Sequence, residues 1–251
     1  MDTLKYKCII FDLDGTIYFG NELAEKANDV ILLARIIAEK IFFVTNNSAK
    51  TRKQILDKLI SLNLDVQLEE VITSSYAISQ YLKYNKFNEV YCIGTNDLKK
   101  QLEENNIITN SKTPSAIVVG YNKDFKLSDL EELANINAQD CKLVVANKER
   151  IYPRENNYIM PGAGPIVNAI EALLDKKTDI IIGKPNIEML KYALKDYNFN
   201  PKDILIVGDS YDSDIKMAQA YGADCILITK EKRNDCQCIE KLADLLEILN
   251  D

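Results

Sequence analysis

Two aspartates two residues apart, Asp12 and Asp14, follow the apolar run 8–11 and precede Gly15. The run is typical of a short buried strand, and alternate side chains of an extended segment point the same way, so both carboxylates can face one small volume at the end of the strand. Two like charges this close repel each other unless a cation or a shared proton lies between them. An acidic turn would have the same residues, because Asp-Gly is a common turn pair. These residues alone are compatible with both a charged site and an ordinary turn.

Further polar segments also follow apolar runs that are typical of strands. In open α/β sheets, ligands bind in the crevice beyond the carboxyl ends of the strands. Each segment alone has an ordinary explanation as a helix cap or a turn. Together they offer a hydroxyl, a lysine and more carboxylates, which suit a phosphoryl group and a hard cation such as Mg²⁺. The residues are Thr45 and Asn46 after 41–44, Lys184 after 180–182, and Asp209 and Asp214 after 204–207.

The composition limits the chemistry that the chain can perform. Histidine is absent from its 251 residues, which excludes Ser-His-Asp and Cys-His catalysis and histidine-ligated metals. The net charge of −7 gives no generic attraction for nucleic acid or an anionic membrane, so we expect neither as a partner. No apolar stretch approaches the roughly 20 residues that span a bilayer, and the first residues lack a signal-peptide pattern.

The six cysteines are scattered, and those beside apolar runs are expected to behave as small hydrophobes. This usage predicts a reducing, cytoplasmic location. Cys236 and Cys238 form a single C-x-C pair, which we place near the start of a helix. Without further ligands, the pair does not by itself indicate a metal or redox site.

Strand-like runs alternate with helix-like runs along the chain, and this order predicts parallel sheets covered by helices on both faces. Among the helices we expect are 22–40, 188–197 and 213–221. The segment 148–165 is rich in proline and glycine, and we expect a loop or a hairpin there.

The four polar segments together resemble the motifs of the haloacid dehalogenase (HAD) superfamily of phosphohydrolases. That family has D-x-D-G-T, a strand-terminal Ser or Thr, a Lys, and an acidic G-D-x-x-x-x-D pattern. Here they stand in order as Asp12 to Thr16, Thr45, Lys184, and Gly208 to Asp214. The long insert between Thr45 and Lys184 resembles the α/β cap of the NagD-like branch, subclass IIA. Further features of that branch are Tyr18-Phe19-Gly20, Thr45-Asn46-Asn47-Ser48, Val119-Gly120-Tyr121, Asn147 with Pro153, Pro161-Gly162-Ala163-Gly164 and Gly183-Lys184-Pro185.

The resemblance implies a fold and a division into domains. It implies an α/β fold, with a doubly wound, Rossmann-like core of parallel strands made from residues 1–78 and 180–251. The strand 8–11 would lie beside the strand 204–207. An inserted α/β cap, residues 79–179, would close over the site, and the branch leaves a homodimer open.

The resemblance also implies roles for the motif residues. Asp12 would be the nucleophile that forms an aspartyl phosphate, and Asp14 would be the general acid and base. A Mg²⁺ ion would be held by Asp12, Asp209 and the backbone carbonyl of Asp14. The phosphoryl oxygens would be bound by Thr45, the Asn46 amide and Lys184, and Asp214 would hold Lys184 or a metal-bound water.

The cap departs from the branch at two positions that concern substrate choice. Asn122 stands where the branch often has Asp, and Glu149 stands where it often has Asp two residues after the Asn. Candidates for substrate specificity in the cap loops are Tyr121, Asn147 and Glu149. The resemblance thus implies a Mg²⁺-dependent phosphatase acting on a small phosphorylated metabolite, with a sugar phosphate or a nucleotide favoured.

Other functions stay open at this point. A phosphotransferase would use an acceptor other than water. A non-catalytic regulator with the same fold would have no need of the acid Asp14. A dehalogenase is disfavoured because that chemistry needs neither the metal nor an acid. Release of p-nitrophenol from its phosphate ester separates an enzyme from a regulator.

Overall fold

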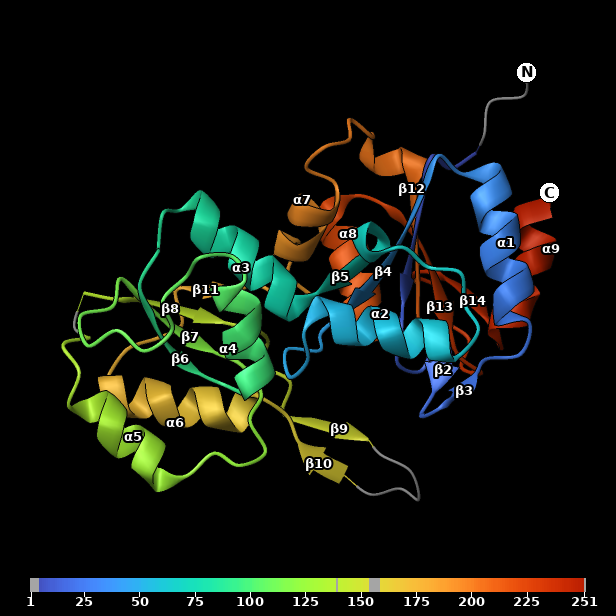
Figure 1. Cartoon of the computed structure of the whole chain (residues 1–251). Coiled ribbons are helices and arrows are strands. Elements are labelled where there is room, and N and C mark those ends of the chain that lie inside the picture. Colours follow the sequence, from blue (N-terminus) through green and yellow to red (C-terminus); the bar gives the residue numbers. More distant parts are fainter. Residues whose placement is uncertain (1–4, 139, 154–158, 251) are drawn as a thin grey trace. The chain divides into compact units, whose positions relative to one another are not determined.

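The structure is a computed structural model, and it describes residues 5–138, 140–153 and 159–250. The described chain divides into two compact units. Unit 1 contains residues 1–45, 55–72 and 184–251, and unit 2 contains residues 46–54 and 73–183. Figure 1 follows the chain through both. No helix in these ranges is both long and apolar enough to cross a bilayer.

Unit 1 is built around a six-stranded sheet in the order β14-β13-β12-β1-β4-β5. The pairs of β1 with β4 and β12, and of β13 with β12 and β14, are parallel. The strand β1 lies beside β12, as predicted, and the strand order reverses there. The strands are β1 (Cys8–Asp12), β4 (Lys40–Thr45), β5 (Val71–Thr73), β12 (Ile204–Gly208), β13 (Asp224–Ile228) and β14 (Gln237–Ile239).

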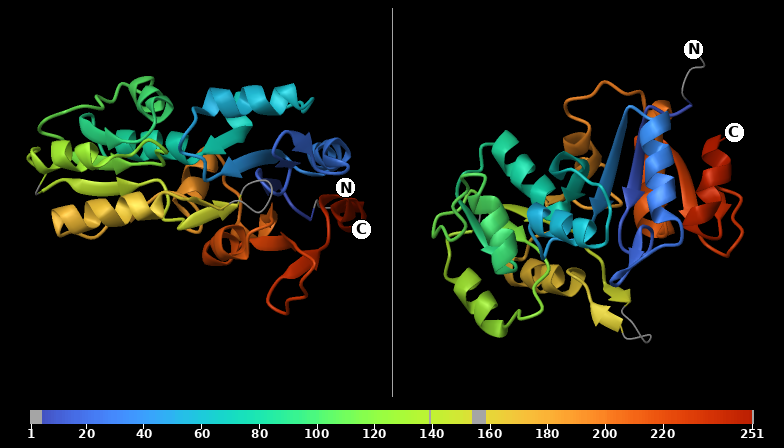
Figure 2. Two further views of the ribbon diagram at one scale, coloured as in Figure 1. Left: turned by 90° about the horizontal axis from the view of Figure 1, so that it is seen from below. Right: turned by 45° about the vertical axis from the view of Figure 1, so that its right-hand side comes forward.

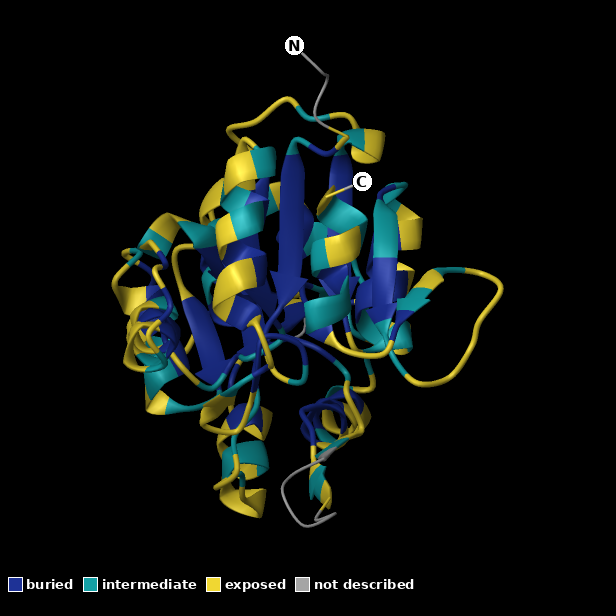
Figure 3. Cartoon of the chain, turned by 90° about the vertical axis from the view of Figure 1, so that its right-hand side faces the viewer, coloured by how far each residue is buried: buried dark blue, intermediate teal, exposed yellow. Residues whose placement is uncertain are grey.

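Both faces of this sheet are covered, as the burial of β1 and β12 along their whole length shows. On one face, alternate strand residues such as Ile9, Phe11 and Phe43 pack with apolar side chains of α1, α2 and α9. Figure 3 shows the buried strands in dark blue beneath helices whose outer faces are exposed. The helices of this part of the chain are α1 (Ala27–Ile37), α2 (Arg52–Ser61), α7 (Glu188–Ala193), α8 (Lys216–Tyr221) and α9 (Leu245–Asn250).

Several local elements differ from the sequence-based expectation. The helix expected at 22–40 is shorter, because its first residues form a small hairpin of β2 (Tyr18–Phe19) with β3 (Glu22–Leu23). The turn between them contains Gly20 at φ 58°, a conformation that glycine adopts without strain. The helix expected at 188–197 ends at Ala193. The strand β14 at the edge of the sheet, which contains Cys238, was not predicted.

Unit 2 has its own sheet in the order β11-β8-β7-β6, and its strand pairs are parallel. A core of side chains from β6, β7 and β8 packs against α5 and α6. In Figure 2, α6 (yellow) covers one face of this sheet and α3 (teal) the other. The elements are β6 (Val90–Ile93), β7 (Ala116–Val119), β8 (Lys142–Val145), β11 (Ile180–Ile181), α3 (Ser74–Tyr84), α4 (Asn96–Glu103), α5 (Leu127–Ala134) and α6 (Gly164–Leu174).

The segment expected as a loop or hairpin contains the antiparallel pair β9 (Ile151–Pro153) and β10 (Ile159–Pro161). The unit boundaries differ from the expected ones, because 46–54, 73–78 and 180–183 belong to unit 2 rather than to the core. Hydrogen bonds explain why 46–54 belongs to unit 2. Thr95 Oγ1 donates to Ala49 O at 2.9 Å, and Ser48 Oγ accepts from Tyr121 N at 2.9 Å. Hydrogen bonds of this kind cannot be read from local sequence patterns.

A buried carboxylate makes the stability of unit 2 dependent on pH. Glu171 Oε1 on α6 accepts from Lys148 Nζ at 2.6 Å and from Thr178 N at 2.6 Å. These donors, opposed by burial, lower the pKa of Glu171 from 4.5 to about 2. Because the folded pKa lies below the unfolded one, the stabilisation is present above about pH 4.5 and disappears as the pH falls towards 2.

We therefore expect Glu171→Gln to cost about 2 kcal/mol of unfolding free energy at pH 7 and progressively less below pH 4.5. Denaturant unfolding at several pH values measures this. Glu131→Gln, at an exposed position on α5, is the control and should change little at any pH. An equal cost for Glu171→Gln at pH 7 and pH 3 would contradict this role.

Candidate active site

Asp12 and Lys184 form the centre of a buried charged cluster in unit 1. Asp12 is the last residue of β1 and is 7% exposed, and Lys184 is 3% exposed. Lys184 Nζ contacts Asp12 Oδ1, lies 2.6 Å from Asp214 Oδ1 and also donates to Val44 O at 3.3 Å. Burial alone would lower the pKa of Lys184, but the two carboxylates raise it, so the ammonium stays charged.

Asp209 and Asp214 reach this cluster from the end of β12. A π-helical turn, Tyr211–Ile215, follows the strand and directs Asp214 inward, where Asp214 Oδ2 accepts from Ser210 N at 3.1 Å. Gly208 makes room, since a Cβ there would lie 2.4 Å from Asp214 Oδ2. Burial and the nearby Asp214 carboxylate raise the pKa of Asp209 to about 6. The turn thus adds two carboxylates to the surroundings of Asp12 and Lys184.

Gly15 allows the loop after β1 to approach Asp209. Its φ is +95°, and a Cβ at this position would lie 2.2 Å from Asp209 Oδ2. The sequence indicated a turn at this glycine and placed it in the first motif. The structure shows that any side chain here would have to displace the Asp209 carboxylate.

Gly15→Ala is therefore expected to lower activity by about 100-fold or more, because it displaces a charged group of the site as well as straining the backbone. Steady-state kinetics over a range of Mg²⁺ concentrations measure the loss. Gly222→Ala is the matched control, since Gly222 has φ +87° and its nearest prospective neighbour, Pro201 Cβ, is 3.5 Å away. Both variants carry backbone strain, and only the first should lose activity; equal activities would contradict the role of Gly15.

The carboxylate of Asp14 has a different environment from that of Asp12. Its residue is exposed, and Asp14 Oδ2 accepts from Tyr18 Oη at 3.0 Å. Burial, followed by the charge of Asp14, raises the pKa of Tyr18, so the phenol remains a hydrogen-bond donor. Two carboxylates of one motif are thus held differently, one against an ammonium and one against a phenol. The sequence placed Tyr18 in the motif region, but it gave no signal for this contact.

Two family models match the segments that carry these residues. A model of the haloacid dehalogenase-like hydrolases matches residues 9–108, and a model described as HAD-hydrolase-like matches residues 181–247. The first segment contains Asp12, and the second contains Lys184, Asp209 and Asp214. The chain belongs to the haloacid dehalogenase-like hydrolases.

The similarity of this hydrolase to known proteins covers most or all of its chain. The chain is 29% identical to the sugar-phosphatase AraL of Bacillus subtilis, over 88% of this chain and 82% of the relative. It is 28% identical to the 5'-nucleotidase YutF of Bacillus subtilis, over 89% of this chain and 87% of the relative. A solved structure of a putative nagD protein covers all of both chains with a TM-score of 0.89 at 24% identity, which shows a shared fold. The predicted superfamily, fold class and phosphatase enzyme class are confirmed, and the NagD-like branch stays a prediction.

The carboxylate cluster of this HAD-like hydrolase fits a divalent cation. Asp12, Asp209 and Asp214 each offer an oxygen, and these oxygens lie within 4.8 Å of one another. The described cluster has three carboxylates and the ammonium of Lys184. A divalent cation would balance the remaining negative charge. Mg²⁺ prefers such oxygen donors and keeps several waters, so a few protein ligands suffice. The side chain of Asp14 is outside the cluster, which leaves only its backbone carbonyl as a ligand.

Thr45 and Asn46, which the sequence predicted to bind the phosphoryl oxygens, stand at the end of β4. Thr45 is the last residue of that strand and is 4% exposed. Asn46 is hydrogen-bonded to other residues of unit 2: Asn46 O accepts from Asn147 Nδ2 at 3.1 Å, and Asn46 Nδ2 donates to Glu149 Oε1 at 2.7 Å. The boundary between the units thus falls at the peptide bond between Thr45 and Asn46.

The three cap candidates for substrate specificity have partners within unit 2. Asn147 is 5% exposed and holds the main chain of Asn46. Tyr121 Oη accepts from Tyr152 Oη at 3.1 Å, and the two rings meet edge to face. Glu149 is exposed and bound to Asn46. Of the three, Asn147 is the most enclosed, so a structural role explains its contacts without a substrate.

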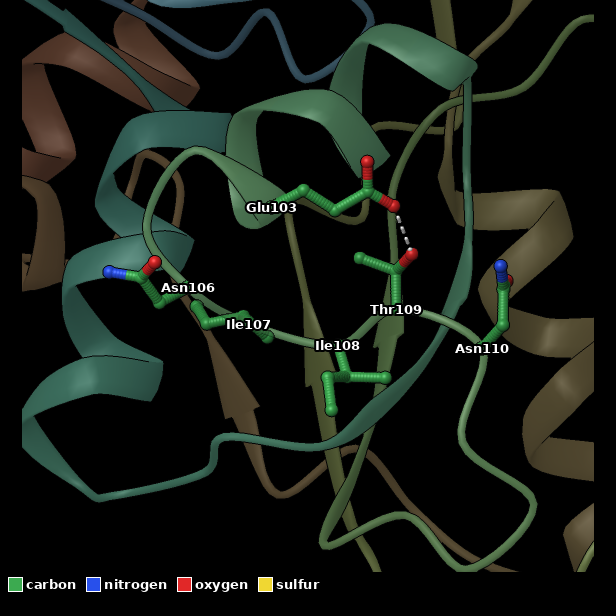
Figure 4. A pocket seen from close by; sticks show the side chains of 6 residues that line it. All are labelled: Glu103, Asn106, Ile107, Ile108, Thr109 and Asn110. Carbon is green, nitrogen blue, oxygen red and sulfur yellow. Dashed lines mark hydrogen bonds between the residues drawn. The ribbon is translucent and has the colours of Figure 1, made fainter.

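Unit 2 also has a surface hollow that contains no predicted site residue. It lies beside the end of α4, where Thr109 Oγ1 donates to Glu103 Oε1 at 2.7 Å (Figure 4). In Figure 4 the amide side chains of Asn106 and Asn110 lie on opposite sides of the view, so the labelled polar groups do not converge. Its lining residues are Glu103, Asn106, Ile107, Ile108, Thr109 and Asn110.

Proposed function

We propose that this chain is a Mg²⁺-dependent phosphomonoesterase that transfers a phosphoryl group first to Asp12 and then to water. One observation carries the proposal: buried Lys184 contacts buried Asp12 and Asp214 through its Nζ, and the exposed Asp209 lies beside them. A carboxylate nucleophile and a phosphate dianion repel each other, and a fixed cation between strand ends reduces that repulsion. The family membership of the chain supports the same reaction class.

In the first step, a carboxylate oxygen of Asp12 attacks phosphorus. The bond between phosphorus and the ester oxygen breaks, and Asp14 gives its proton to the departing oxygen. The products are an alcohol, an aspartyl phosphate on Asp12 and an ionised Asp14. Covalent catalysis of this kind divides one difficult displacement into two easier ones.

In the second step, water attacks the phosphorus of the aspartyl phosphate, and Asp14 takes the proton of the water. The bond between phosphorus and the Asp12 oxygen breaks, which restores both carboxyl groups and releases inorganic phosphate. The exposed position of Asp14 suits a group that exchanges protons with substrate and water, whereas buried Asp12 suits a nucleophile shielded from solvent.

Lys184, Thr45 and the backbone amide of Asn46 would bind the phosphoryl oxygens. Transfer of a phosphoryl group depends mainly on positioning and on charge stabilisation, so a chain without histidine can perform it. A Mg²⁺ ion bound by Asp12, Asp209 and the Asp14 carbonyl, with Asp214 nearby, would neutralise charge on the phosphoryl oxygens.

The substrate that we propose is a small phosphorylated metabolite, with a sugar phosphate or a nucleotide favoured. The names of the two curated relatives, a sugar phosphatase and a 5'-nucleotidase, support this class. Tyr121 and Glu149 are the cap residues that we propose to influence substrate choice. A phosphotransferase is the second candidate function, and it is distinguished by the product: phosphate released to water or phosphate transferred to an added alcohol.

The test is hydrolysis of p-nitrophenyl phosphate, followed by a panel of sugar phosphates and nucleotides. We expect turnover with Mg²⁺, a loss of about 100-fold or more after treatment with EDTA, and recovery when Mg²⁺ is added back, because three crowded carboxylates remain without their cation. Buffer exchange without chelator is the control. Activity that is indifferent to EDTA would remove the metal from the proposal, and no turnover of any ester would remove the enzyme.

A further inference from the structure

A tight turn brings Tyr18 back to Asp14 in unit 1. Tyr18 N donates to Leu13 O at 3.2 Å, and Gly15 N donates to Tyr18 O at 2.9 Å. The main chain of Asp14 also forms an isolated bridge with that of Tyr18. The loop therefore closes on itself over four residues, and the position of the tyrosine is fixed by the same turn that carries the aspartate.

The contact between these side chains joins a buried group to an exposed one. Tyr18 is 1% exposed, whereas Asp14 is exposed, and their hydrogen bond of 3.0 Å uses Asp14 Oδ2. A buried phenol needs a partner, so satisfaction of the hydroxyl alone could explain the bond. The bond also has a consequence for Asp14, because it restrains an exposed carboxylate at Oδ2 and leaves Oδ1 for another partner.

The ring of Tyr18 is itself held in place. Lys58 Nζ, from α2, lies 3.5 Å from the centroid of the ring, within the range of a cation–π contact. Tyr18 also belongs to the main hydrophobic core of unit 1. A side chain fixed on its face and in the core presents its hydroxyl with little freedom, which is the property that a positioning group needs.

We propose that Tyr18 is a positioning residue for Asp14, holding Oδ2 so that Oδ1 is directed to the oxygen of the leaving group. The proposal rests on the proposed function, since it assigns Tyr18 a part in the proton transfer from Asp14. Tyr18 itself touches neither the phosphorus nor the leaving group. Its loss should therefore matter most where that proton is needed most.

The test compares two substrates that differ in their need for an acid. A p-nitrophenolate leaving group departs without protonation, whereas the alkoxide of glycerol 2-phosphate does not. The quantity compared is kcat/KM, because it reports the steps up to transfer to Asp12 and excludes the hydrolysis of the aspartyl phosphate. We expect Tyr18→Phe to lower kcat/KM by about 30-fold for glycerol 2-phosphate and by only about threefold for p-nitrophenyl phosphate.

Two further variants separate positioning from a merely structural effect. Tyr91→Phe is the matched control, because Tyr91 is also buried and its hydroxyl donates to Glu132 Oε2 at 2.9 Å, within unit 2. It should leave the ratio of the two kcat/KM values unchanged. In an Asp14→Asn background, Tyr18→Phe should have no further effect on the ratio, since its action passes through the Asp14 carboxylate.

Equal losses for the two esters in Tyr18→Phe, or the same loss of ratio with and without the Asp14 carboxylate, would overturn the proposal. A failure of the proposed function looks different, because the unmodified enzyme would then hydrolyse neither ester. Thermal unfolding of each variant identifies a loss of folding, which would lower both kcat/KM values by the same factor.

Discussion

An Asp12→Asn variant is expected to lose at least about 10⁴-fold in kcat, because the amide cannot act as the nucleophile that forms the aspartyl phosphate. Steady-state turnover of p-nitrophenyl phosphate measures the loss. The fold should persist, since the substitution removes one of three crowded carboxylates and leaves Lys184 paired with Asp214.

Trapping the covalent intermediate makes this prediction sharper. Acid quenching during turnover should show a phosphorylated fraction of the unmodified enzyme by intact-protein mass and none of Asp12→Asn. Asp14→Asn should accumulate more of it with p-nitrophenyl phosphate, because the first step needs no acid there and the second has lost its base.

Asp196→Asn, at an exposed position of unit 1, is the control for an aspartate substitution and should keep the activity of the unmodified enzyme. Turnover at the unmodified rate by Asp12→Asn, in a preparation whose mass confirms the substitution, would refute the assignment of the nucleophile. Phosphorylation of that variant would show that another residue accepts the phosphoryl group.

Lys184→Ala is expected to reduce both activity and stability. Activity should fall by about 10³-fold, because a fixed charge facing the phosphoryl group is lost. The free energy of unfolding should fall by about 3–5 kcal/mol, because Asp12 and Asp214 remain buried at 7% and 1% exposure without the ammonium that pairs with them. Steady-state kinetics and denaturant unfolding measure the two effects.

A double-mutant cycle isolates the stability effect from a general loss of packing. In an Asp12→Asn background, Lys184→Ala should cost about 1–3 kcal/mol less, since one of the two carboxylates is already neutral. Lys241→Ala removes an ion pair with Glu25 in which both side chains are more than half exposed, and it should change stability by less than about 1 kcal/mol. An unchanged kcat and KM for Lys184→Ala would contradict the role of the lysine.

The two variants test opposite sides of one contact. Asp12→Asn should abolish chemistry with little cost to the fold, whereas Lys184→Ala should cost both. This difference follows from charge. Removal of one carboxylate reduces the repulsion among the carboxylates, whereas removal of the ammonium leaves that repulsion uncompensated. If Asp12→Asn were the more destabilising of the two, the balance of charges that we describe for the cluster would be wrong.

The sequence predicted the elements that carry the site better than the residues that arrange it. Apolar runs such as 8–11 and 204–207 are strong signals for buried strands, and polar residues at their ends indicated where a site would lie. The hairpin at 18–23 and the edge strand β14 were missed, because a two- or three-residue strand is defined by its partner and carries little pattern of its own.

The sequence by itself determined the chemical groups available to this protein: carboxylates, one lysine and a threonine at strand ends, no histidine, and a family pattern that gives them an order. Only the tertiary structure decided which of them meet. Asp12 and Lys184 are 172 residues apart in the chain, and their side chains meet at the carboxyl end of β1. Asp209 and Asp214 join them because β12, the strand that precedes both, lies parallel to β1. The close approach of Gly15 to Asp209 and the bond from Tyr18 to Asp14 likewise depend on distances set by packing, and local patterns of residues contain no distances.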